Sequence, residues 1–328
     1  MSTKDCLLSV TDLCVDFQTD HGTLNVLDHV SFDIEKGKTL GLVGESGCGK
    51  SVTSLAIMKL LPQPAGNIRS GTVSFNDVPL SSLVPKELRK IRGNRIAMIF
   101  QEPMTALNPV KAIGKQIAEV FELHRPELTK KQMFEETINV LDKAGIPDAG
   151  KRVFEYPHQL SGGMRQRVMI AMALACKPDL LIADEPTTAL DVTIQAQILD
   201  LMQSLQKEYG MGILFITHDL GVIAELCDDV VVMYAGRVAE KSSVKELFKQ
   251  PKHPYTKGLL NSIPKLNQAN KSRLNTIEGQ VPTLQNMPQG CRFYNRCPYK
   301  QEDCKTLDHS FINQNGSNYV NCLHWHEI

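Results

Sequence analysis

One short run of residues constrains the fold of this chain more than any other feature. It matches the pattern G-x-x-x-x-G-K-[ST] and reads Gly44-Glu45-Ser46-Gly47-Cys48-Gly49-Lys50-Ser51. An apolar run at residues 40–43 precedes it, and a helical pattern begins at Ser51. Glycines let the backbone curl so that its N–H groups point inward at phosphate oxygens, and the helix N-terminus adds positive potential. The run therefore predicts a strand, a phosphate-binding loop and a helix.

Such a loop assigns roles to individual side chains. Lys50 can reach the β- and γ-phosphates of a nucleotide, and the Ser51 hydroxyl can ligate Mg²⁺. The residues expected to contact the nucleotide are Gly44, Ser46, Gly47, Cys48, Gly49, Lys50, Ser51 and Val52. The loop alone does not decide which kind of nucleotide hydrolase this is.

The rest of the first 240 residues has an α/β pattern. Short, nearly continuous apolar runs are typical of parallel strands that are buried on both faces, and they occur at residues 40–43, 96–100, 180–183, 213–216 and 230–234. Helical patterns at 51–61 and 192–209 separate several of them. Period-two alternation before residue 80 predicts an additional antiparallel sheet.

Two segments differ from this core. Residues 102–176 are mostly helical in pattern, with helices expected at 115–123 and 130–144, and form a predicted helical subdomain. After about residue 240 the chain becomes polar and rich in proline. We therefore expect one domain at residues 1–240 and an irregular C-terminal extension at residues 241–328.

Polar residues follow three of the predicted strands. Asp184 and Glu185 end one strand, and we expect Asp184 to hold Mg²⁺ and Glu185 to act as the general base. His218 and Gln101 end two others, at the sheet edge where open α/β sheets bind ligands. His218 would contact the γ-phosphate and Gln101 the metal or the attacking water. Taken singly, the acidic pair is better interpreted as an ordinary polar strand end, and a lone histidine is more often structural than catalytic.

The segment Leu160-Ser161-Gly162-Gly163-Met164-Arg165-Gln166 predicts a second anion-binding helix end. Ser161 is a good N-cap, and the two glycines allow an anion to approach the exposed N–H groups. The segment closely resembles the signature motif of ATP-binding cassette (ABC) transporter ATPases. The resemblance implies that Ser161, Gly162, Gly163 and Gln166 contact the nucleotide of a second subunit, so that two subunits enclose ATP–Mg²⁺ between them.

The other motifs of that family occur in the same order. Phe17 is at the position of an adenine-stacking aromatic, Gln101 is the Q-loop residue, Ala189-Leu190-Asp191 resembles the D-loop, and His218 is the switch histidine. The resemblance covers about residues 7–240. It implies a P-loop NTPase fold with a RecA-like parallel-sheet core, an antiparallel β subdomain and a helical subdomain. It also places Asp191 at the interface between the two subunits.

A narrower resemblance concerns the transported solute. Residues 101–109, 156–160, 190–197 and 253–260 resemble segments of the oligopeptide and dipeptide importer ATPases. This implies a subunit that powers import of di- or oligopeptides. Nickel and glutathione importers share much of the pattern and stay open as alternatives. ABC ATPases of DNA repair or translation and exporter ATPases are less consistent with the C-terminal extension and the single cassette.

Four cysteines cluster near the C-terminus, at Cys291, Cys297, Cys304 and Cys322. Their spacing lacks the C-x2-C pairs of common zinc ribbons, yet four thiolates on an irregular segment can bind [4Fe–4S] or Zn²⁺. Resemblance to dipeptide-importer ATPases implies the iron–sulfur cluster. Zinc, or thiols without a ligand, are the alternatives, and His324 or His326 could replace Cys322.

Charge and hydropathy bear on partners. Lys plus Arg and Asp plus Glu both number 36, a balance that argues against a nucleic-acid partner. No apolar run approaches the roughly 20 residues that span a bilayer. The family resemblance implies a second ATPase subunit in a heterodimer, two transmembrane permease subunits and, indirectly, an extracytoplasmic substrate-binding protein. We therefore expect peripheral association with the cytoplasmic face of the plasma membrane.

Overall fold

The computed structural model describes residues 5–20, 22–102, 106–188, 190–263, 276–306, 312–315 and 318–328. The chain divides into two compact units. The first unit comprises Met1–Leu7, Ile34–Lys38 and Ser82–Ile216. The second unit comprises Leu8–Asp33, Thr39–Ser81 and Thr217–Ile328. This division differs from the boundary expected near residue 240, which stays a prediction.

Most of the second unit's N-terminal part is an antiparallel sheet. Its strand order is β2-β1-β4-β5, and the strands are β1 (Cys6–Thr19), β2 (Gly22–Glu35), β4 (Gly66–Phe75) and β5 (Val78–Pro79). On β4, Val73 and Phe75 are buried on either side of a half-buried Ser74. This alternation is why the sheet has one packed face, and it confirms the predicted antiparallel strands.

The second unit also contains the strand that leads into the phosphate loop. Strand β3 (Thr39–Val43) pairs in parallel with β9 (Asp229–Tyr234), and all five residues of β3 are buried. Strand β10 (Arg237–Ser243) then pairs antiparallel with β9. The helices of this unit are α1 (Lys50–Ile57), α9 (Leu220–Leu226), α10 (Val244–Lys249) and α11 (Pro254–Asn261).

Two C-terminal strands extend this sheet. Strand β12 (Asn318–Val320) pairs with β10, and β11 (Ile312–Asn315) pairs with β12. Val320 is fully buried, so this pairing is anchored by an apolar contact as well as by backbone hydrogen bonds. The polar composition of the extension did not predict these strands, because each is only three or four residues long.

The first unit contains three parallel strands, β6 (Ile96–Ile99), β7 (Leu180–Asp184) and β8 (Gly212–Thr217). Every residue of β7 and β8 is buried, as expected for strands covered on both faces. Helix α8 (Val192–Tyr209) has the bounds that its periodicity predicted. The shorter α2 (Pro85–Ile91) precedes β6.

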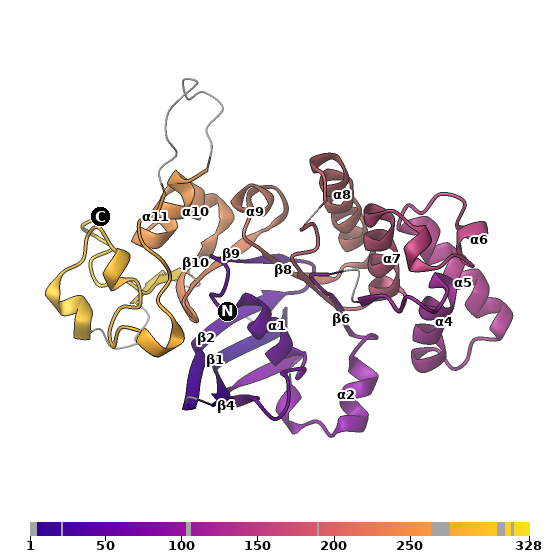
Figure 1. The fold of residues 1–328 in the computed structure, drawn as a ribbon, viewed down its shortest axis with the longest axis horizontal. Coiled ribbons are helices and arrows are strands. Elements are labelled where there is room, and N and C mark those ends of the chain that lie inside the picture. Colours follow the sequence, from indigo (N-terminus) through magenta and orange to yellow (C-terminus); the bar gives the residue numbers. More distant parts are fainter. Residues whose placement is uncertain are drawn as a thin grey trace. The chain divides into compact units, whose positions relative to one another are not determined.

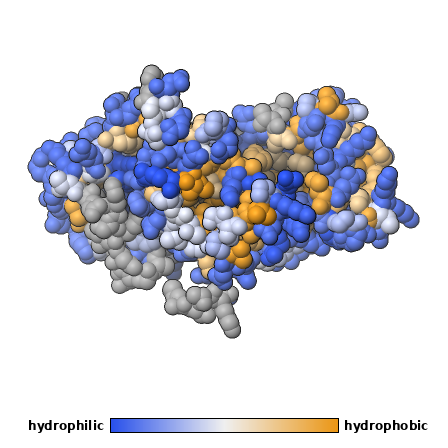
Figure 2. Space-filling view, turned by 90° about the horizontal axis from the view of Figure 1, so that it is seen from below, coloured by the Kyte–Doolittle hydropathy of each residue, from blue (hydrophilic) through white to orange (hydrophobic). Residues whose placement is uncertain are grey.

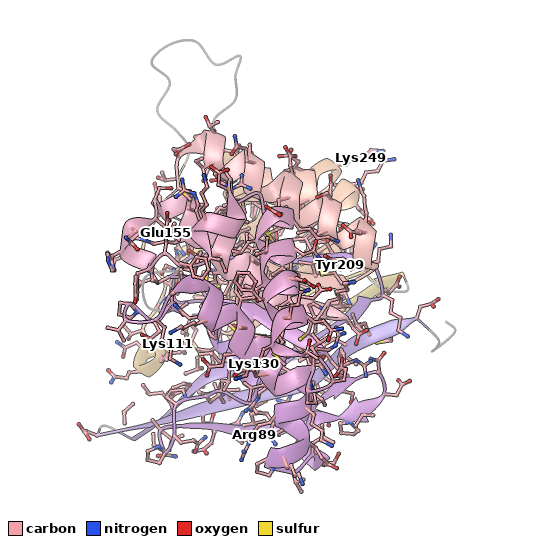
Figure 3. All side chains as sticks on the ribbon, turned by 90° about the vertical axis from the view of Figure 1, so that its right-hand side faces the viewer. Arg89, Lys111, Lys130, Glu155, Tyr209 and Lys249 are labelled. Carbon is pink, nitrogen blue, oxygen red and sulfur yellow. The ribbon has the colours of Figure 1, made fainter. Side chains whose placement is uncertain are left out.

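The helical subdomain of the first unit is confirmed. It consists of α4 (Ile113–His124), α5 (Lys130–Lys143), α6 (Ala149–Arg152) and α7 (Gly162–Leu174), which cluster together in Figure 1. Ile117, Phe121, Leu141 and Val168 are among the residues of their shared core. Charged side chains project from the outside of these helices, and Figure 3 labels Lys130 on α5 among them.

One predicted helix ends early. The pattern at residues 51–61 predicted a helix of that length, but α1 ends at Ile57. Lys59 has a φ of 51°, in the left-handed region, and Pro62 and Pro64 follow. A left-handed residue stops the helix, and the prolines prevent it from resuming.

Among the described residues, no helix has the length and apolar character needed to cross a membrane. Hydrophobic residues nevertheless reach the surface, and Figure 2 shows them on one face in several patches separated by hydrophilic residues. In the first unit, Leu123 is 71% exposed and Phe154 is 67% exposed. These two belong to the helical subdomain.

Candidate functional site

The phosphate loop curls around the side chain of Lys50. Its Nζ donates hydrogen bonds to the backbone carbonyls of Gly44, at 2.8 Å, and Glu45, at 3.2 Å, and the residue is 5% exposed. A Cβ at Gly44 would lie 2.2 Å from the carbonyl oxygen of Met233, and Gly47 has a φ of 80°. Both positions therefore require glycine, as expected of a loop whose N–H groups surround phosphate.

Other residues of the predicted nucleotide site also lie in the second unit. Ser46 and Gly47 are exposed, Ser51 and Val52 are half-buried at the start of α1, and Cys48 and Gly49 are buried. Burial raises the pKa of the Cys48 thiol, so Cys48 stays protonated and serves as a packed residue. Phe17 is half-buried on β1 opposite Gly66. His218 is exposed directly after β8.

The predicted hydrolytic residues of the first unit meet at the end of β7. Asp184 is the last residue of that strand and is 4% exposed. Glu185 follows with a φ of 46°, and its N–H donates to the carbonyl of Ile216 on β8. The Glu185 carboxylate accepts hydrogen bonds from Gln101 Nε2, at 3.2 Å, and from Thr188 Oγ1, at 2.9 Å.

These hydrogen bonds orient the carboxylate of Glu185, whose backbone has a sparsely populated conformation directly after the strand. It brings together Gln101 and Glu185, which the sequence predicted separately. Thr188 is a residue that the sequence analysis missed. Its only signal was its position three residues after Glu185, which is the spacing at which a hydroxyl can reach back across a turn.

The signature segment opens α7 as expected. Ser161 is the N-cap, and its hydroxyl accepts a hydrogen bond from the N–H of Met164 at 3.3 Å. Ser161 and Gly162 are exposed, and a Cβ at Gly162 would meet no atom within 4 Å. A Cβ at Gly163 would lie 2.9 Å from Ile194 Cγ2. The first glycine thus leaves the helix end open, while the second allows α7 to approach α8.

Two other residues assigned to the subunit interface have local roles. Asp191 is the N-cap of α8, and its Oδ1 accepts from the N–H of Ile194 at 2.9 Å. Gln166 is 2% exposed, so its side chain points into the subunit. Their contacts with a second subunit stay predictions. Ala189 of the predicted D-loop and residues 103–105 of the Q-loop segment lie outside the described residues.

The four C-terminal cysteines line one small cavity in the second unit, with a volume of about 20 Å³. Aromatic neighbours in its wall include Phe293, Tyr294 and Tyr299. Burial, assisted by the other thiols, raises the pKa of Cys291 to about 11 and that of Cys322 to about 12. Burial also raises the pKa of Cys297. A group that bound these thiols as thiolates would therefore displace protons.

Two family models match the chain. The model described as ABC transporter matches residues 27–188, which include the phosphate loop, the signature segment and the end of β7. The model described as oligopeptide/dipeptide transporter, C-terminal region, matches residues 239–304. The second match includes three of the four clustered cysteines, Cys291, Cys297 and Cys304.

Curated relatives match nearly the whole chain. The dipeptide transport ATP-binding protein DppD of Bacillus subtilis is 50% identical over 96% of this chain and 94% of its own length. The oligopeptide transport ATP-binding protein AppD of the same organism is 49% identical over 98% of this chain and 97% of its own. OppD of Escherichia coli, an oligopeptide transport ATP-binding protein, is 50% identical over 92% and 88%.

Solved structures support the fold. A dimeric structure of the ATP-binding cassette MJ0796 bound to ADP and Pi has a TM-score of 0.65 and 26% identity, and it covers 73% of this chain and 99% of that one. The cbiO1 protein of Clostridium perfringens, part of an ABC transporter complex, has a TM-score of 0.63 and 29% identity over 75% and 92%. The chain therefore belongs to the ABC transporter family of ATPases, within the group that carries the oligopeptide/dipeptide-transporter C-terminal region.

Proposed function

We propose that this ATPase powers the import of di- or oligopeptides through a membrane ABC transporter. The observation that carries the proposal is the combination of an ABC cassette with a C-terminal region of the oligopeptide/dipeptide type, together with relatives about half identical over nearly their full length. Nickel or glutathione import by the same machinery is the alternative, because specificity resides in other subunits. A non-transport ABC ATPase is a further alternative.

Each residue of the proposed site has its own role in ATP binding or hydrolysis. Lys50 and the N–H groups of the phosphate loop bind the β- and γ-phosphates, and Phe17 stacks on the adenine. Ser51, Gln101 and Asp184 hold Mg²⁺ directly or through water. Glu185 takes the proton of the attacking water while Gln101 and Thr188 orient its carboxylate. His218 contacts the γ-phosphate.

A second subunit completes each nucleotide site. The open helix end at Ser161 and Gly162 has its N–H groups and positive dipole directed outward, where they can bind a phosphate held by another chain. The dimeric cassette among the solved relatives is consistent with this arrangement. We propose a heterodimer with a sister ATPase, in which Asp191 and the signature segment that ends at Gln166 lie at the interface.

The helical subdomain is the proposed contact with two transmembrane permease subunits. The rings of Phe134 and Phe154 lie 5.9 Å apart, and both residues are exposed. Exposed aromatic pairs of this kind suit a protein interface. Through these contacts the ATPase would be held at the cytoplasmic face of the plasma membrane, while a separate binding protein supplies the substrate.

The cysteine cavity is the proposed site of a [4Fe–4S] cluster. Four thiols that line one cavity with apolar, aromatic walls fit a four-thiolate cluster, which such surroundings shield from water. The cluster would supply a rigid cross-link between distant parts of the extension. Zinc is the alternative, because the ligand atoms of Asp303, Cys304 and His324 lie within 4.8 Å of one another.

Affinity purification from detergent-solubilised membranes tests the transport role. The tagged chain should bring down two hydrophobic permeases and a second cassette protein in stoichiometric amounts. The same purification with a tag on an unrelated cytoplasmic ATPase is the control. Recovery of ribosomes or DNA, without a membrane subunit, would favour the non-transport alternative.

A further inference from the structure

The phosphate loop forms an ion pair with the C-terminal extension. Both guanidinium nitrogens of Arg296 bind the carboxylate of Glu45, at 2.6 Å to Oε2 and 3.1 Å to Oε1. The Arg296 side chain is 5% exposed and that of Glu45 is 30% exposed. A bidentate pair of this kind fixes both orientation and distance, unlike a flexible surface contact. Glu45 is the second residue of the phosphate loop, directly after Gly44.

The surroundings of Arg296 hold the guanidinium in place. Its Nε donates to the carbonyl of Glu278 at 3.0 Å, and its charge lies over the ring of Tyr234. Burial opposes the charged form, but the hydrogen bonds to Glu45 and the charge of its carboxylate outweigh it and raise the pKa of Arg296. The hydroxyl of Tyr255 also accepts a hydrogen bond from the N–H of Glu45 at 2.9 Å.

Arg296 directly precedes one of the clustered cysteines. The turn Tyr294–Arg296 lies between Cys291 and Cys297, and the N–H of Tyr294 donates to the carbonyl of Cys291 at 3.0 Å. The N–H of Cys297 donates back to the carbonyl of Tyr294 at 3.4 Å. One turn of backbone therefore determines where both thiols and the Arg296 side chain lie.

A second arginine makes a parallel connection. Arg292, directly after Cys291, donates to the carbonyl of Ala235 and, at 2.9 Å, to the carboxylate of Asp28. Gly236, which follows Ala235 in the chain, donates its N–H to the carbonyl of Cys48 in the phosphate loop at 2.9 Å. The cysteine-bearing segment thus contacts the phosphate loop directly through Arg296. It also contacts the loop indirectly, from Arg292 through Ala235 and Gly236.

We propose that Arg296 is a positioning residue for the phosphate loop and that it couples occupancy of the cysteine site to nucleotide affinity. The inference rests on the proposed metal group at Cys291, Cys297, Cys304 and Cys322. When that site is filled, the turn is fixed, and Arg296 neutralises and orients Glu45. When the site is empty, the turn relaxes, and the Glu45 carboxylate is less well paired beside the polyphosphate.

The direction of the expected change in nucleotide affinity follows from the negative charge of Glu45. An unpaired carboxylate next to the phosphates repels them, so loss of Arg296 alone weakens nucleotide binding. Loss of the Glu45 charge removes the source of that repulsion. The variant Arg296→Gln should therefore bind nucleotide more weakly, and the double variant Arg296→Gln with Glu45→Gln should recover part of the affinity. A merely structural role for Arg296 would not give such a recovery.

The test measures binding of ADP with Mg²⁺ to the full chain, because the loop contacts the β-phosphate and ADP is not hydrolysed. Wild type, both single variants and the double variant are each measured with the cysteine site filled, after anaerobic purification, and emptied with a chelator. We expect emptying to weaken ADP binding by the wild type about tenfold, within the usual range of coupling between two sites. Replacing either Arg296 or Glu45 should abolish most of this difference in ADP affinity between the filled and the emptied protein.

The matched control is Gln301→Ala. Gln301 lies three residues before Cys304, and its exposed side chain donates to the exposed Glu327 rather than to the turn Tyr294–Arg296. This variant should respond to emptying as the wild type does. Equal ADP affinity of filled and emptied wild type, or an undiminished response in Arg296→Gln, would overturn the coupling while leaving the metal site intact. A chain that contains no metal after anaerobic purification overturns the metal site and the coupling together.

The wild type alone provides a second measurement in case the variants fold poorly. Coupling between two binding sites is reciprocal, so ADP should strengthen retention of the metal group by the same factor. Loss of the group to a chelator, followed by visible absorbance, should then be slower in saturating ADP. An unchanged loss rate and an unchanged metal affinity would contradict the proposal.

Discussion

The side-chain amide of Gln101 donates a hydrogen bond of 3.2 Å to the carboxylate of Glu185, although the two residues lie 84 positions apart. Gln101 follows β6 and Glu185 follows β7, two parallel strands paired along their length. Pairing of the strands is what brings their ends together. Gln101, which follows β6, thereby orients the carboxylate of Glu185, the proposed general base.

The first prediction concerns that base. Glu185→Gln should abolish ATP hydrolysis, with a fall in kcat of at least about a hundredfold, because an amide cannot accept the proton of the attacking water. ATP binding should persist, and ATP–Mg²⁺ should trap a closed dimer with the partner ATPase. Phosphate release and size-exclusion chromatography measure the two effects. Glu122→Gln, at an exposed position of α4, is the control, and brisk hydrolysis by Glu185→Gln would exclude Glu185 as the base.

A second prediction contrasts the two signature glycines. Gly162→Ala adds a methyl group into open space in the single chain, so its melting temperature should be unchanged or slightly higher. Its ATPase activity should nevertheless fall, because the methyl group would occupy the side that we propose faces the partner's nucleotide.

Gly163→Ala should behave differently, since its methyl group would lie 2.9 Å from Ile194 Cγ2. We expect a loss of about 1–3 kcal/mol in the free energy of unfolding, the usual cost of overpacking. Chemical denaturation of both variants makes the comparison. Equal stability loss in the two variants would argue that Gly162 also packs within its own chain.

A third prediction concerns pH. His253 is 3% exposed, and burial lowers its pKa to about 4. A histidine whose pKa is lower in the folded state binds its proton mainly when unfolded. The contribution of neutral His253 to the free energy of unfolding is therefore complete above about pH 6.5. This contribution is lost as the pH falls from there toward 4, and the loss is up to about 3 kcal/mol.

The variant His253→Asn isolates this contribution. Asparagine can also accept the N–H of Tyr255, which His253 Nδ1 accepts at 3.0 Å, and it does not titrate. Urea unfolding of both chains, emptied of metal, should show a smaller loss of stability between about pH 7.5 and pH 4.5 in the variant. Identical pH profiles would show that His253 does not titrate in this way.

The fourth prediction identifies the metal. Anaerobically purified protein should contain about four iron and four sulfide per chain, as expected for one [4Fe–4S] cluster. Cys297→Ser should lose the iron, because one of the four thiolates is missing, whereas Cys6→Ser at the start of β1 should retain it. Elemental analysis and visible absorbance measure both. Zinc at about one per chain, without iron, would favour the alternative site around Cys304.

Several features could be predicted because they depend on neighbouring residues. The glycines and Lys50 of the phosphate loop, the apolar runs of β3, β7 and β8, and the periodicity of α8 each determine their local structure. Local pattern does not give the end of α1, since the left-handed conformation of Lys59 is a property of the folded backbone. It does not give β11 and β12 either, because such short strands form only when a sheet edge is available.

The sequence by itself determined that the chain is an ABC ATPase. The motifs of that family consist of glycines, capping residues and apolar runs that are close together in the sequence, so each can be recognised without the fold. Only the tertiary structure decided which side chains meet. Thr188 joins Gln101 at Glu185, the four cysteines line one cavity, and Arg296 reaches Glu45 across 251 positions. These contacts depend on how strands pair and loops pack, which short-range patterns do not encode.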